Sequence, residues 1–281
     1  MKKVIVAKSA GFCWGVSRAF DKVMEIVKTK KDDSNVFTYG PLIHNPQAVE
    51  MLKEMGVDVL DDMPQKICGT VFIRTHGLSP AEREQLKKSG AKICDATCPD
   101  VGIIQGIVRK YVRKGYNVII VGNSEHPEVR AILGYAEGKG VAVLSSKEIE
   151  KLPKNLEKVC VVAQSTQKEE TFEKLVQLIK SKFPKAEIFN TICSSTTERQ
   201  EEVRSLAKEV DAMVVVGGYN SANTTKLAQI SREIGALTFH IETEKELNPN
   251  DFKDFSVVGV TAGSSTPNWL IERVVKRLSS F

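Results

Sequence analysis

Three cysteines stand in similar surroundings at widely separated points of this chain: Cys13, Cys98 and Cys193. Each follows a strand-like apolar segment and precedes a segment with helical periodicity. Pro99, directly after Cys98, suits the first position of a helix, where a backbone N–H is not needed. The positive end of a helix favours a thiolate, which is the form of cysteine that binds metal. We therefore treat the three cysteines as candidate metal ligands.

The spacing of these cysteines distinguishes between two kinds of metal site. Structural zinc sites normally contain a local C-x2-4-C pair, and the close pair in this chain is Cys94 with Cys98. The three candidate ligands are separated by 85 and 95 residues, which favours a [4Fe–4S] cluster held by distant parts of the chain. Such a cluster normally has four cysteine ligands, so three would leave one iron open to a substrate.

The other three cysteines, Cys68, Cys94 and Cys160, do not occupy equivalent positions. A single cysteine in a protein usually behaves as a small hydrophobic residue and is buried. We therefore expect these three to be core residues rather than ligands.

Polar turns after the predicted strands form a second set of candidate residues. Three of the four histidines lie in such turns, and hydroxyl and amide side chains occupy corresponding turns elsewhere. Backbone N–H groups of the helices behind these turns would add donors for an anion. The set suits a phosphate or diphosphate, although Ser, Thr and Asn are also ordinary helix caps. Its members are His44, His76, His126, Ser165, Thr166, Ser221, Asn223 and Ser265.

Glu128 lies two residues after His126, in the first turn of a predicted helix. An acidic residue there complements the helix dipole. Beside a metal in a closed cavity, the same carboxylate could instead relay protons. Asp95, Asp100 and Glu125 are the nearest competing carboxylates, and the residues alone rank the four only weakly.

The elements that must position these residues alternate between strands and helices, which is typical of an α/β fold with parallel sheets. Strands are predicted at Val4–Ala7, Val36–Tyr39, Val71–Arg74, Ile93–Asp95, Val118–Val121, Val141–Leu144, Val159–Ala163, Glu187–Asn190, Met213–Val216, Leu237–Ile241 and Val257–Thr261. Helices are predicted at Val16–Lys28, Pro46–Met55, Pro80–Lys88, Val101–Lys114, His126–Glu137, Lys168–Phe183, Thr197–Val210, Asn223–Ile234 and Thr266–Leu278.

A long-period repeat organises these elements. Each repeat of roughly 90 residues opens with a strand, a cysteine and a helix, and continues with two strands that end in polar turns. Ligands of open α/β sheets bind beyond the carboxyl ends of the strands, where all these turns would lie. We therefore expect three similar α/β domains, built from βαβα repeats with parallel sheets, in a pseudo-threefold trefoil around a central cavity.

The net charge and the lengths of the apolar runs indicate which kinds of partner the protein can bind. With 40 basic and 35 acidic residues the net charge is +5, too mild to indicate nucleic acid but suited to anionic ligands. Lys8 ends the apolar run that begins at Val4, so we expect a first strand there rather than a signal peptide. No apolar run approaches the roughly 20 residues that span a bilayer. We expect a cytoplasmic protein without a membrane partner, in which thiols stay reduced.

Distinctive motifs are spread along nearly the whole chain. They are Gly11-Phe-Cys13-x-Gly-Val-x-Arg-Ala, Ile43-His44-Asn45, His76-Gly, Ala96-Thr-Cys98-Pro, His126-Pro-Glu128-Val, Thr191-Ile-Cys193-x-x-Thr-Thr-x-Arg-Gln200, Asn220-Ser221-x-Asn223-Thr and Thr261-Ala-Gly-x-Ser265. Together they resemble the motifs of the 4-hydroxy-3-methylbut-2-enyl diphosphate reductase family, and the combination is highly specific.

The resemblance implies an iron–sulfur oxidoreductase that carries out the last step of the methylerythritol phosphate route to isoprenoids. It implies one [4Fe–4S] cluster with one open iron and three ligands, Cys13, Cys98 and Cys193. An allylic diphosphate would be dehydroxylated to isopentenyl and dimethylallyl diphosphates, with ferredoxin or flavodoxin as electron donor. The residues implied in substrate binding are His44, His76, His126, Ser165, Thr166, Ser221, Asn223 and Ser265, and those implied in catalysis are Glu128, His126 and Thr166.

The resemblance also implies that the first strand joins the last domain. The expected domains are then residues 14–97, residues 98–192, and residues 193–281 together with 1–13. Two positions depart from the family pattern. Ser165 stands where the family usually has threonine, and Ala222 stands where it often has a second serine, so one donor to the diphosphate is absent.

Two other functions fit the same residues. The helix-backed turns could hold a phosphorylated metabolite in a non-catalytic binding protein whose cysteines are structural. Alternatively, the three cysteines could hold zinc in a hydrolase that uses Glu128 as base. The presence of iron and sulfide in the purified protein would distinguish the reductase from both.

Overall fold

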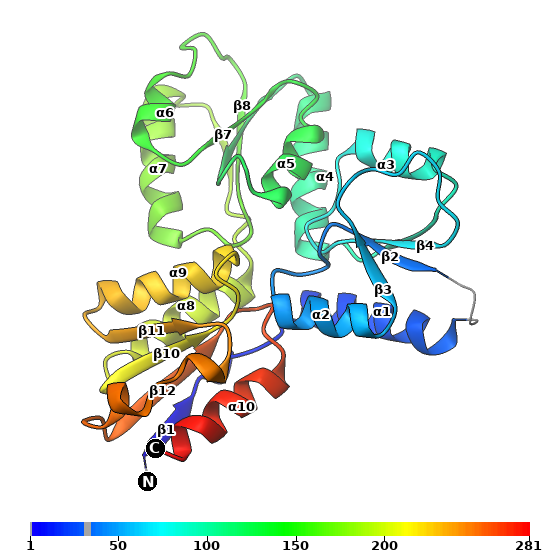
Figure 1. The fold of residues 1–281 in the computed structure, drawn as a ribbon. Helices are drawn as coiled ribbons and strands as arrows, with labels where there is room; N and C mark the ends of the chain where they lie inside the picture. The colour runs from blue at the N-terminus through cyan, green and yellow to red at the C-terminus, as the bar shows by residue number, and fades with distance from the viewer. Residues whose placement is uncertain (1, 31–34) are drawn as a thin grey trace. The chain divides into compact units, whose positions relative to one another are not determined.

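The computed structural model describes residues 2–30 and 35–281, in which strands and helices alternate along the chain (Figure 1). The domain ranges expected from the sequence include residues 1 and 31–34, which lie outside this description. The chain divides into two compact units. The first unit comprises Met1–Ser17, Ile43–Leu52 and Ser194–Phe281, and the second comprises Arg18–Leu42 and Lys53–Cys193.

The first unit contains one parallel four-stranded sheet. Its strand order is β1 (Lys3–Val6), β12 (Val257–Ala262), β10 (Ala212–Val216) and β11 (Leu237–Ile241). Helix α10 (Asn268–Ser279) packs its apolar residues on one face of this sheet. Helices α8 (Ser194–Leu206) and α9 (Ala222–Glu233) pack on the other face. Two short 3-10 helices, η1 (Glu244–Glu246) and η2 (Pro249–Phe252), follow β11.

The second unit contains two further parallel sheets. The strands of one are, in order, β3 (Val57–Leu60), β2 (Val36–Tyr39), β4 (Thr70–Ile73) and β5 (Lys92–Asp95). The strands of the other are β7 (Gly140–Val143), β6 (Asn117–Val121), β8 (Val159–Ala163) and β9 (Glu187–Phe189). The remaining helices along the chain are α1 (Trp14–Thr29), α2 (Pro46–Glu54), α3 (Pro80–Lys88), α4 (Pro99–Arg113), α5 (Pro127–Gly134), α6 (Ser146–Glu150) and α7 (Glu169–Lys182).

The three sheets share one topology. If the repeats start at β2, β6 and β10, each sheet has the strand order second, first, third, fourth. In the last sheet β1 takes the place of the fourth strand, and Lys3 of β1 pairs with Val257 of β12. In every sheet the fourth strand leads toward one of the three candidate ligand cysteines. The expected fold class, three α/β repeats with parallel sheets, is confirmed.

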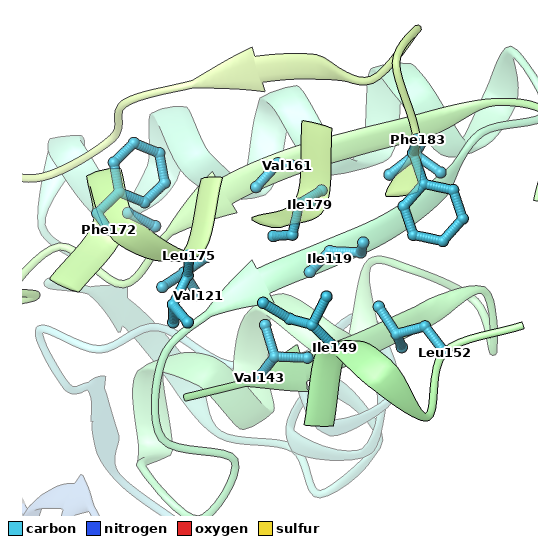
Figure 2. Close-up of a cluster of buried hydrophobic side chains, with 12 residues drawn as sticks. Ile119, Val121, Val143, Ile149, Leu152, Val161, Phe172, Leu175, Ile179 and Phe183 are labelled. Carbon is cyan, nitrogen blue, oxygen red and sulfur yellow. The ribbon is translucent and has the colours of Figure 1, made fainter. Parts of the chain in front are cut away.

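Buried aliphatic side chains hold each sheet to its helices. In the β6–β9 sheet, Ile119 of β6 and Val161 of β8 pack against Leu175 and Ile179 of α7, with Ile149 of α6 beside them (Figure 2). The opposite face of the same sheet packs against α4 and α5. Strands buried on both faces are near-continuous in Val and Ile, as β6 and β8 are. This packing fixes the carboxyl ends of the strands, from which the polar turns emerge.

The sequence-based predictions differ from the structure at a few places. Strand β3 and helix α6 were not predicted, because each is only four or five residues long and contains charged residues. The expectation for Cys68 is wrong: it lies exposed in the connection before β4, where no sheet covers it. Cys160 on β8 is buried as expected, and Cys94 on the edge strand β5 is half-buried. Among the helices that the structure describes, none combines the length and apolar character needed to cross a bilayer.

Candidate functional site

Cys98 occupies the position predicted for it, directly before a helix. It is the N-cap residue of α4, with Pro99 at the first helical position. Its backbone N–H donates to the carbonyl oxygen of Thr75, in the turn after β4, over 2.9 Å. The peptide of Cys98 is therefore tied to the end of the neighbouring strand.

The same hydrogen bond recurs at the other two candidate ligands. The N–H of Cys193 donates to the carbonyl of Ser165, after β8, over 2.9 Å. The N–H of Cys13 donates to the carbonyl of Ser264, after β12, over 3.2 Å. All three cysteines are half-buried and are not in disulfides. Each acceptor precedes one of the candidate substrate residues, which are His76, Thr166 and Ser265.

The remaining cysteines are in different surroundings. Burial raises the pKa of Cys160 to about 12, and it also raises the pKa of Cys94. A thiol with a raised pKa is a poor nucleophile and a poor metal ligand at neutral pH, because both roles require the thiolate. These two residues therefore contribute packing.

Cys193 has an acidic neighbour from the helix that begins after Cys98. Its Sγ lies 3.0 Å from Oδ2 of Asp100, in the first turn of α4. The contact brings the start of α4 to the third cysteine. Both residues belong to the second unit, as does Cys98.

Glu128 is one of the most buried acidic residues of the chain, with 2% of its surface exposed. It lies in the first turn of α5 and accepts two hydrogen bonds from Ser165. The backbone N–H of Ser165 donates to Oε1 over 2.6 Å, and the Ser165 hydroxyl donates to Oε2 over 2.7 Å. A carboxylate held at both oxygens has a fixed orientation, and a hydroxyl on it can pass a proton.

His126 caps the same helix. Its Nδ1 accepts the backbone N–H of Glu128 over 3.2 Å, which in the neutral ring places the proton on Nε2. Nε2 is therefore a hydrogen-bond donor, as an anionic ligand requires. The ring of His76 lies edge-on to that of His126, with centroids 5.3 Å apart. The structure thus brings these two predicted residues together.

Thr166 follows Ser165 in the turn after β8. Its hydroxyl accepts a hydrogen bond from Nε2 of Gln164 over 3.3 Å. The expected help of Thr166 for Glu128 stays a prediction, and the neighbouring Ser165 also donates its hydroxyl to Glu128. Choosing between adjacent hydroxyl residues requires knowledge of which way each side chain points, and the sequence does not contain it.

In the first unit, Ser221 and Asn223 lie at the start of α9. Ser221 is the N-cap residue, and its Oγ accepts the backbone N–H of Thr224 over 3.3 Å. Asn223 is 4% exposed, and its side-chain oxygen and nitrogen both lack a hydrogen-bond partner among the described residues. A buried amide without partners costs about 1–3 kcal/mol. Such a group is typical of a site completed by a ligand.

His44 lies in the same unit as Ser265. The Ser265 hydroxyl donates to the carbonyl of His44 over 3.0 Å. Gly218, in the turn after β10, leaves room for that carbonyl, because a Cβ at this position would lie 2.9 Å from it. The turns after β10 and β12 therefore hold the His44 segment. His76 and His126 belong to the other unit.

A polar network supports the turn that leads to Ser221. The Tyr219 N–H donates to Glu242 over 2.9 Å, and its hydroxyl donates to Glu246, which raises the pKa of Tyr219 to about 12. Nε2 of His240 lies 3.0 Å from the carbonyl oxygen of Gly217. Burial lowers the pKa of His240, so the ring stays neutral at pH 7. The sequence alone does not predict this network, because α9 separates the contacting residues along the chain.

Comparison with protein families identifies close relatives. A family model described as LytB protein matches residues 4–279. A protein from Geobacter sulfurreducens named 4-hydroxy-3-methylbut-2-enyl diphosphate reductase is 45% identical over 279 residues, covering 99% of this chain and 98% of that protein. A protein of the same name from Aquifex aeolicus is 44% identical, with 99% and 96% covered.

Two solved structures are also similar. One, described as (E)-4-hydroxy-3-methyl-but-2-enyl diphosphate reductase, the terminal enzyme of the non-mevalonate pathway, has 43% identity and a TM-score of 0.74, with both chains fully covered. The other, an E-1-hydroxy-2-methyl-but-2-enyl-4-diphosphate reductase from Plasmodium falciparum, has 28% identity and a TM-score of 0.91. The match covers 98% of this chain and 87% of that chain.

Proposed function

The chain belongs to the LytB protein family, and we propose that the site described above performs the reaction for which its relatives are named. The activity is that of an iron–sulfur 4-hydroxy-3-methylbut-2-enyl diphosphate reductase, the last step of the methylerythritol phosphate route. Two electrons and two protons are consumed. The allylic C–O bond breaks, a C–H bond forms and the hydroxyl leaves as water, giving isopentenyl and dimethylallyl diphosphates.

The observation that carries this proposal is the hydrogen bond repeated at the three cysteines. Each candidate ligand is tied through its backbone N–H to the residue that precedes a candidate substrate residue. A single cysteine with such a bond would be unremarkable. Three of them in equivalent places of three repeats support one shared site for a metal group and an anionic substrate.

The donor set suits an iron–sulfur cluster. Cys13, Cys98 and Cys193 are half-buried thiols outside disulfides, and Cys98 is placed at the positive end of α4. We propose that they hold one [4Fe–4S] cluster with one open iron. When bound, the cluster would supply electrons one at a time and a Lewis-acidic metal. The electron donor that we propose is a ferredoxin or a flavodoxin. We also propose a cytoplasmic location, where a reducing environment keeps cysteines out of disulfides.

The substrate diphosphate would be held by donors from several turns. In the first unit we propose His44, Ser221, Asn223 and Ser265. The buried, unpartnered amide of Asn223 is the strongest local support, since a diphosphate oxygen would accept from its nitrogen. The N-terminus of α9 adds backbone N–H groups and a favourable dipole. Ala222 stands where the family often has serine, so the hydroxyl donor of that serine is absent.

In the second unit, His76 and His126 would complete the diphosphate site. The Nε2 proton that the cap of α5 imposes on His126 supports its role as a donor. Arrays of oriented donors neutralise the substrate's charge without reorganising during the reaction.

Proton delivery is assigned to the pair of Glu128 and Ser165, with Thr166 beside them. In the structure the Ser165 hydroxyl donates to Glu128. When Glu128 is protonated, the hydroxyl can rotate to give its proton to a substrate oxygen while Ser165 Oγ accepts the proton of Glu128. We propose that this route protonates the leaving hydroxyl group. We also propose that the domains are residues 14–97, residues 98–192, and residues 193–281 together with 1–13.

The test is spectroscopic and is made on anaerobically purified protein. We expect iron and sulfide in stoichiometric amounts and a broad visible absorption. We also expect the reduced protein to convert the allylic diphosphate. A colourless protein that contains zinc without iron or sulfide would contradict the proposal and favour a hydrolase. A colourless, metal-free protein that still binds the diphosphate would favour a non-catalytic binding protein.

A further inference from the structure

The stretch that leads into Cys98 is held by a helix that starts beside another cysteine. Helix α1 begins directly after Cys13, and its Arg18 donates from Nη1 to the carbonyl oxygen of Thr97 over 3.1 Å. That carbonyl belongs to the peptide that joins Thr97 to Cys98. With the Cys98 N–H bound to Thr75, both polar groups of this peptide are fixed.

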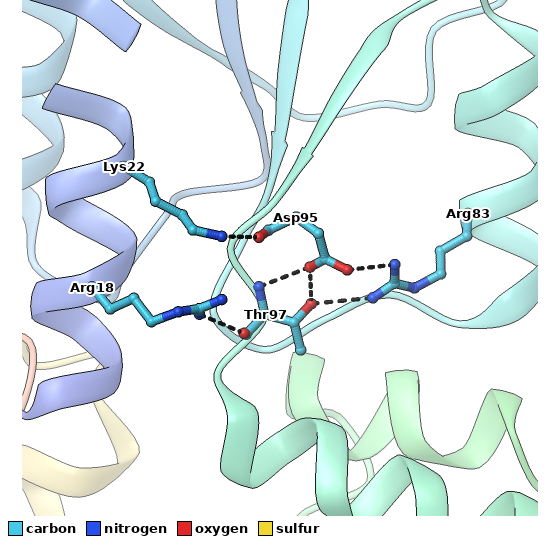
Figure 3. A network of polar contacts seen from close by, with 5 residues as sticks. All are labelled: Arg18, Lys22, Arg83, Asp95 and Thr97. Atoms are coloured by element: carbon cyan, nitrogen blue, oxygen red, sulfur yellow. Dashed lines mark hydrogen bonds and ion pairs between the residues drawn. The ribbon is translucent and has the colours of Figure 1, made fainter. Parts of the chain in front are cut away.

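Further contacts hold the same stretch, as Figure 3 shows. Lys22, one turn after Arg18 on α1, donates to the carbonyl of Asp95 over 3.0 Å. From the opposite side, Arg83 of α3 forms an ion pair with Asp95 at 2.7 Å and donates to the Thr97 hydroxyl over 3.2 Å. The Asp95 carboxylate in turn accepts the N–H of Thr97 over 2.9 Å. Asp95 and Thr97 are therefore held from two helices.

The stretch that leads into Cys13 is held in a related way. Helix α8 begins directly after Cys193, and its Arg199 donates from Nη2 to the carbonyl of Gly11 over 2.7 Å. Arg199 is buried, and its other terminal nitrogen donates to the carbonyl of Ser195 over 2.9 Å. The guanidinium thus bridges the start of α8 and the peptide two residues before Cys13.

The third contact of this kind uses an acid. Helix α4 begins directly after Cys98, and its Asp100 reaches the side chain of Cys193. The contacts therefore follow a cyclic order along the chain. The helix after the first cysteine holds the second, the helix after the second holds the third, and the helix after the third holds the first.

We propose that Arg18 and Arg199 are positioning residues, each for a cysteine distant from it along the chain. Arg18 positions Cys98, and Arg199 positions Cys13. Hydrogen bonds from a charged donor are stronger than neutral ones, and a guanidinium keeps its charge at every relevant pH. Each arginine would hold its cysteine ready before any iron is bound. The inference rests on the proposed role of these cysteines as ligands.

The test measures the reactivity of individual thiols in the iron-free protein. Apoprotein is pulsed with iodoacetamide under reducing, anaerobic conditions, and labelling of each cysteine is quantified by peptide mass spectrometry. The variants are Arg18→Met and Arg199→Met, which keep much of the side-chain volume and remove the donors. Arg109→Met, at an exposed position of α4, is the matched control. Exposed Cys68 serves as internal standard in every sample.

We expect a specific pattern. Arg18→Met should raise labelling of Cys98 about tenfold relative to Cys68, which corresponds to the loss of one charged hydrogen bond, and should leave Cys13 and Cys193 unchanged. Arg199→Met should do the same at Cys13 alone. Arg109→Met should change none of them. On reconstitution with iron and sulfide, both positioning variants should take up the cluster more slowly than the control.

Other outcomes would overturn the inference. Equal increases at all cysteines in either variant would mean general loosening, and unchanged labelling would mean that the contacts do not position the thiols. If a methionine variant does not fold, Arg18→Lys and Arg199→Lys, which retain one cationic donor, should give smaller increases at the same cysteine. An increase elsewhere would contradict the assignment. Because labelling needs no iron, the result is independent of whether the proposed cluster is found.

Discussion

The backbone N–H of Cys193 donates to the carbonyl oxygen of Ser165 over 2.9 Å. The same Ser165 donates its own N–H and its hydroxyl to the carboxylate of Glu128. One residue therefore connects a proposed cluster ligand with the proposed proton donor. A shift of Cys193 on binding or losing metal would move the hydroxyl on which the carboxylate depends.

Replacing Glu128 by glutamine tests the proton route. Glu128→Gln keeps the shape of the side chain, so the cluster and substrate binding should remain. Turnover should fall by about 10²–10⁴-fold, the usual contribution of a general acid or base. The test measures visible absorption, substrate binding to the oxidised protein and turnover on one preparation. The first two should be unchanged, and only turnover should fall. Full activity would remove Glu128 from the mechanism.

The six cysteines should fall into two groups when replaced singly by alanine. Cys13→Ala, Cys98→Ala and Cys193→Ala should lose the cluster. Cys68→Ala, Cys94→Ala and Cys160→Ala should retain it, at some cost in stability for buried Cys160. Iron and sulfide content after anaerobic reconstitution is the measurement. The opposite grouping would refute the ligand assignment.

Asn223 should show opposite effects on stability and binding. Asn223→Leu removes a buried amide that has no partner among the described residues, so the ligand-free protein should become more stable by up to about 1–3 kcal/mol. The same change should weaken diphosphate binding by roughly 10–100-fold, as expected for one lost buried hydrogen bond to a charged group. Denaturant unfolding of the apoprotein measures the expected gain in stability, and KM for the substrate measures the expected loss of binding. A less stable variant with unchanged KM would show that the amide serves the fold.

Asp95 should contribute to acid stability. Burial alone would raise its pKa, but the hydrogen bonds from Thr97 and Arg83 outweigh burial and lower it. The stabilisation is therefore complete above the unfolded-state value of about 4, and it is lost as the pH falls through the lower folded-state pKa. The effect should stay below about 1 kcal/mol because the pair is partly exposed.

Asp95→Asn should remove this pH dependence. Urea midpoints of variant and parent apoprotein should differ at pH 6 and converge toward pH 3, as the parent carboxylate is protonated. Glu202→Gln is a useful comparison, because Glu202 also has a lowered pKa. Its carboxylate makes a different contact, with Ser9. A difference for Asp95→Asn that is constant with pH would show that the charge is not the source of its stabilisation.

The sequence predicted the strand–helix alternation well because most strands, such as β6, β8 and β10, are dense runs of apolar residues. The bounds of β2, β8 and β11 agree with the predictions to the residue. Pro99 correctly marked the start of α4. Strand β3 escaped because Asp58 interrupts a four-residue segment that has only a weak apolar pattern.

Side-chain partners could not be predicted in the same way. The sequence contains two adjacent hydroxyl residues after β8, and only the fold shows that Ser165 donates to Glu128. Arg18 and Arg199 lie in motifs that the resemblance identified. Their contacts with residues 97 and 11 depend on the folded chain bringing a helix to a distant turn. Helices and strands can be predicted because they depend on the residues of a short segment. The hydrogen bonds of Arg18 and Arg199 join residues that are far apart along the chain, so no local pattern indicates them.

The place of β1 in its sheet has a consequence for biogenesis. The ribosome synthesises β1 long before β12, the strand with which it pairs. The acceptor for the Cys13 N–H, Ser264, follows β12 and comes later still. Strand β1 therefore has no sheet partner until β12 has been synthesised. A cluster held by all three proposed ligands can therefore form only after β12 and Ser264 have been synthesised, and a chain that ends before β12 lacks the strand and the backbone acceptor that hold the Cys13 segment.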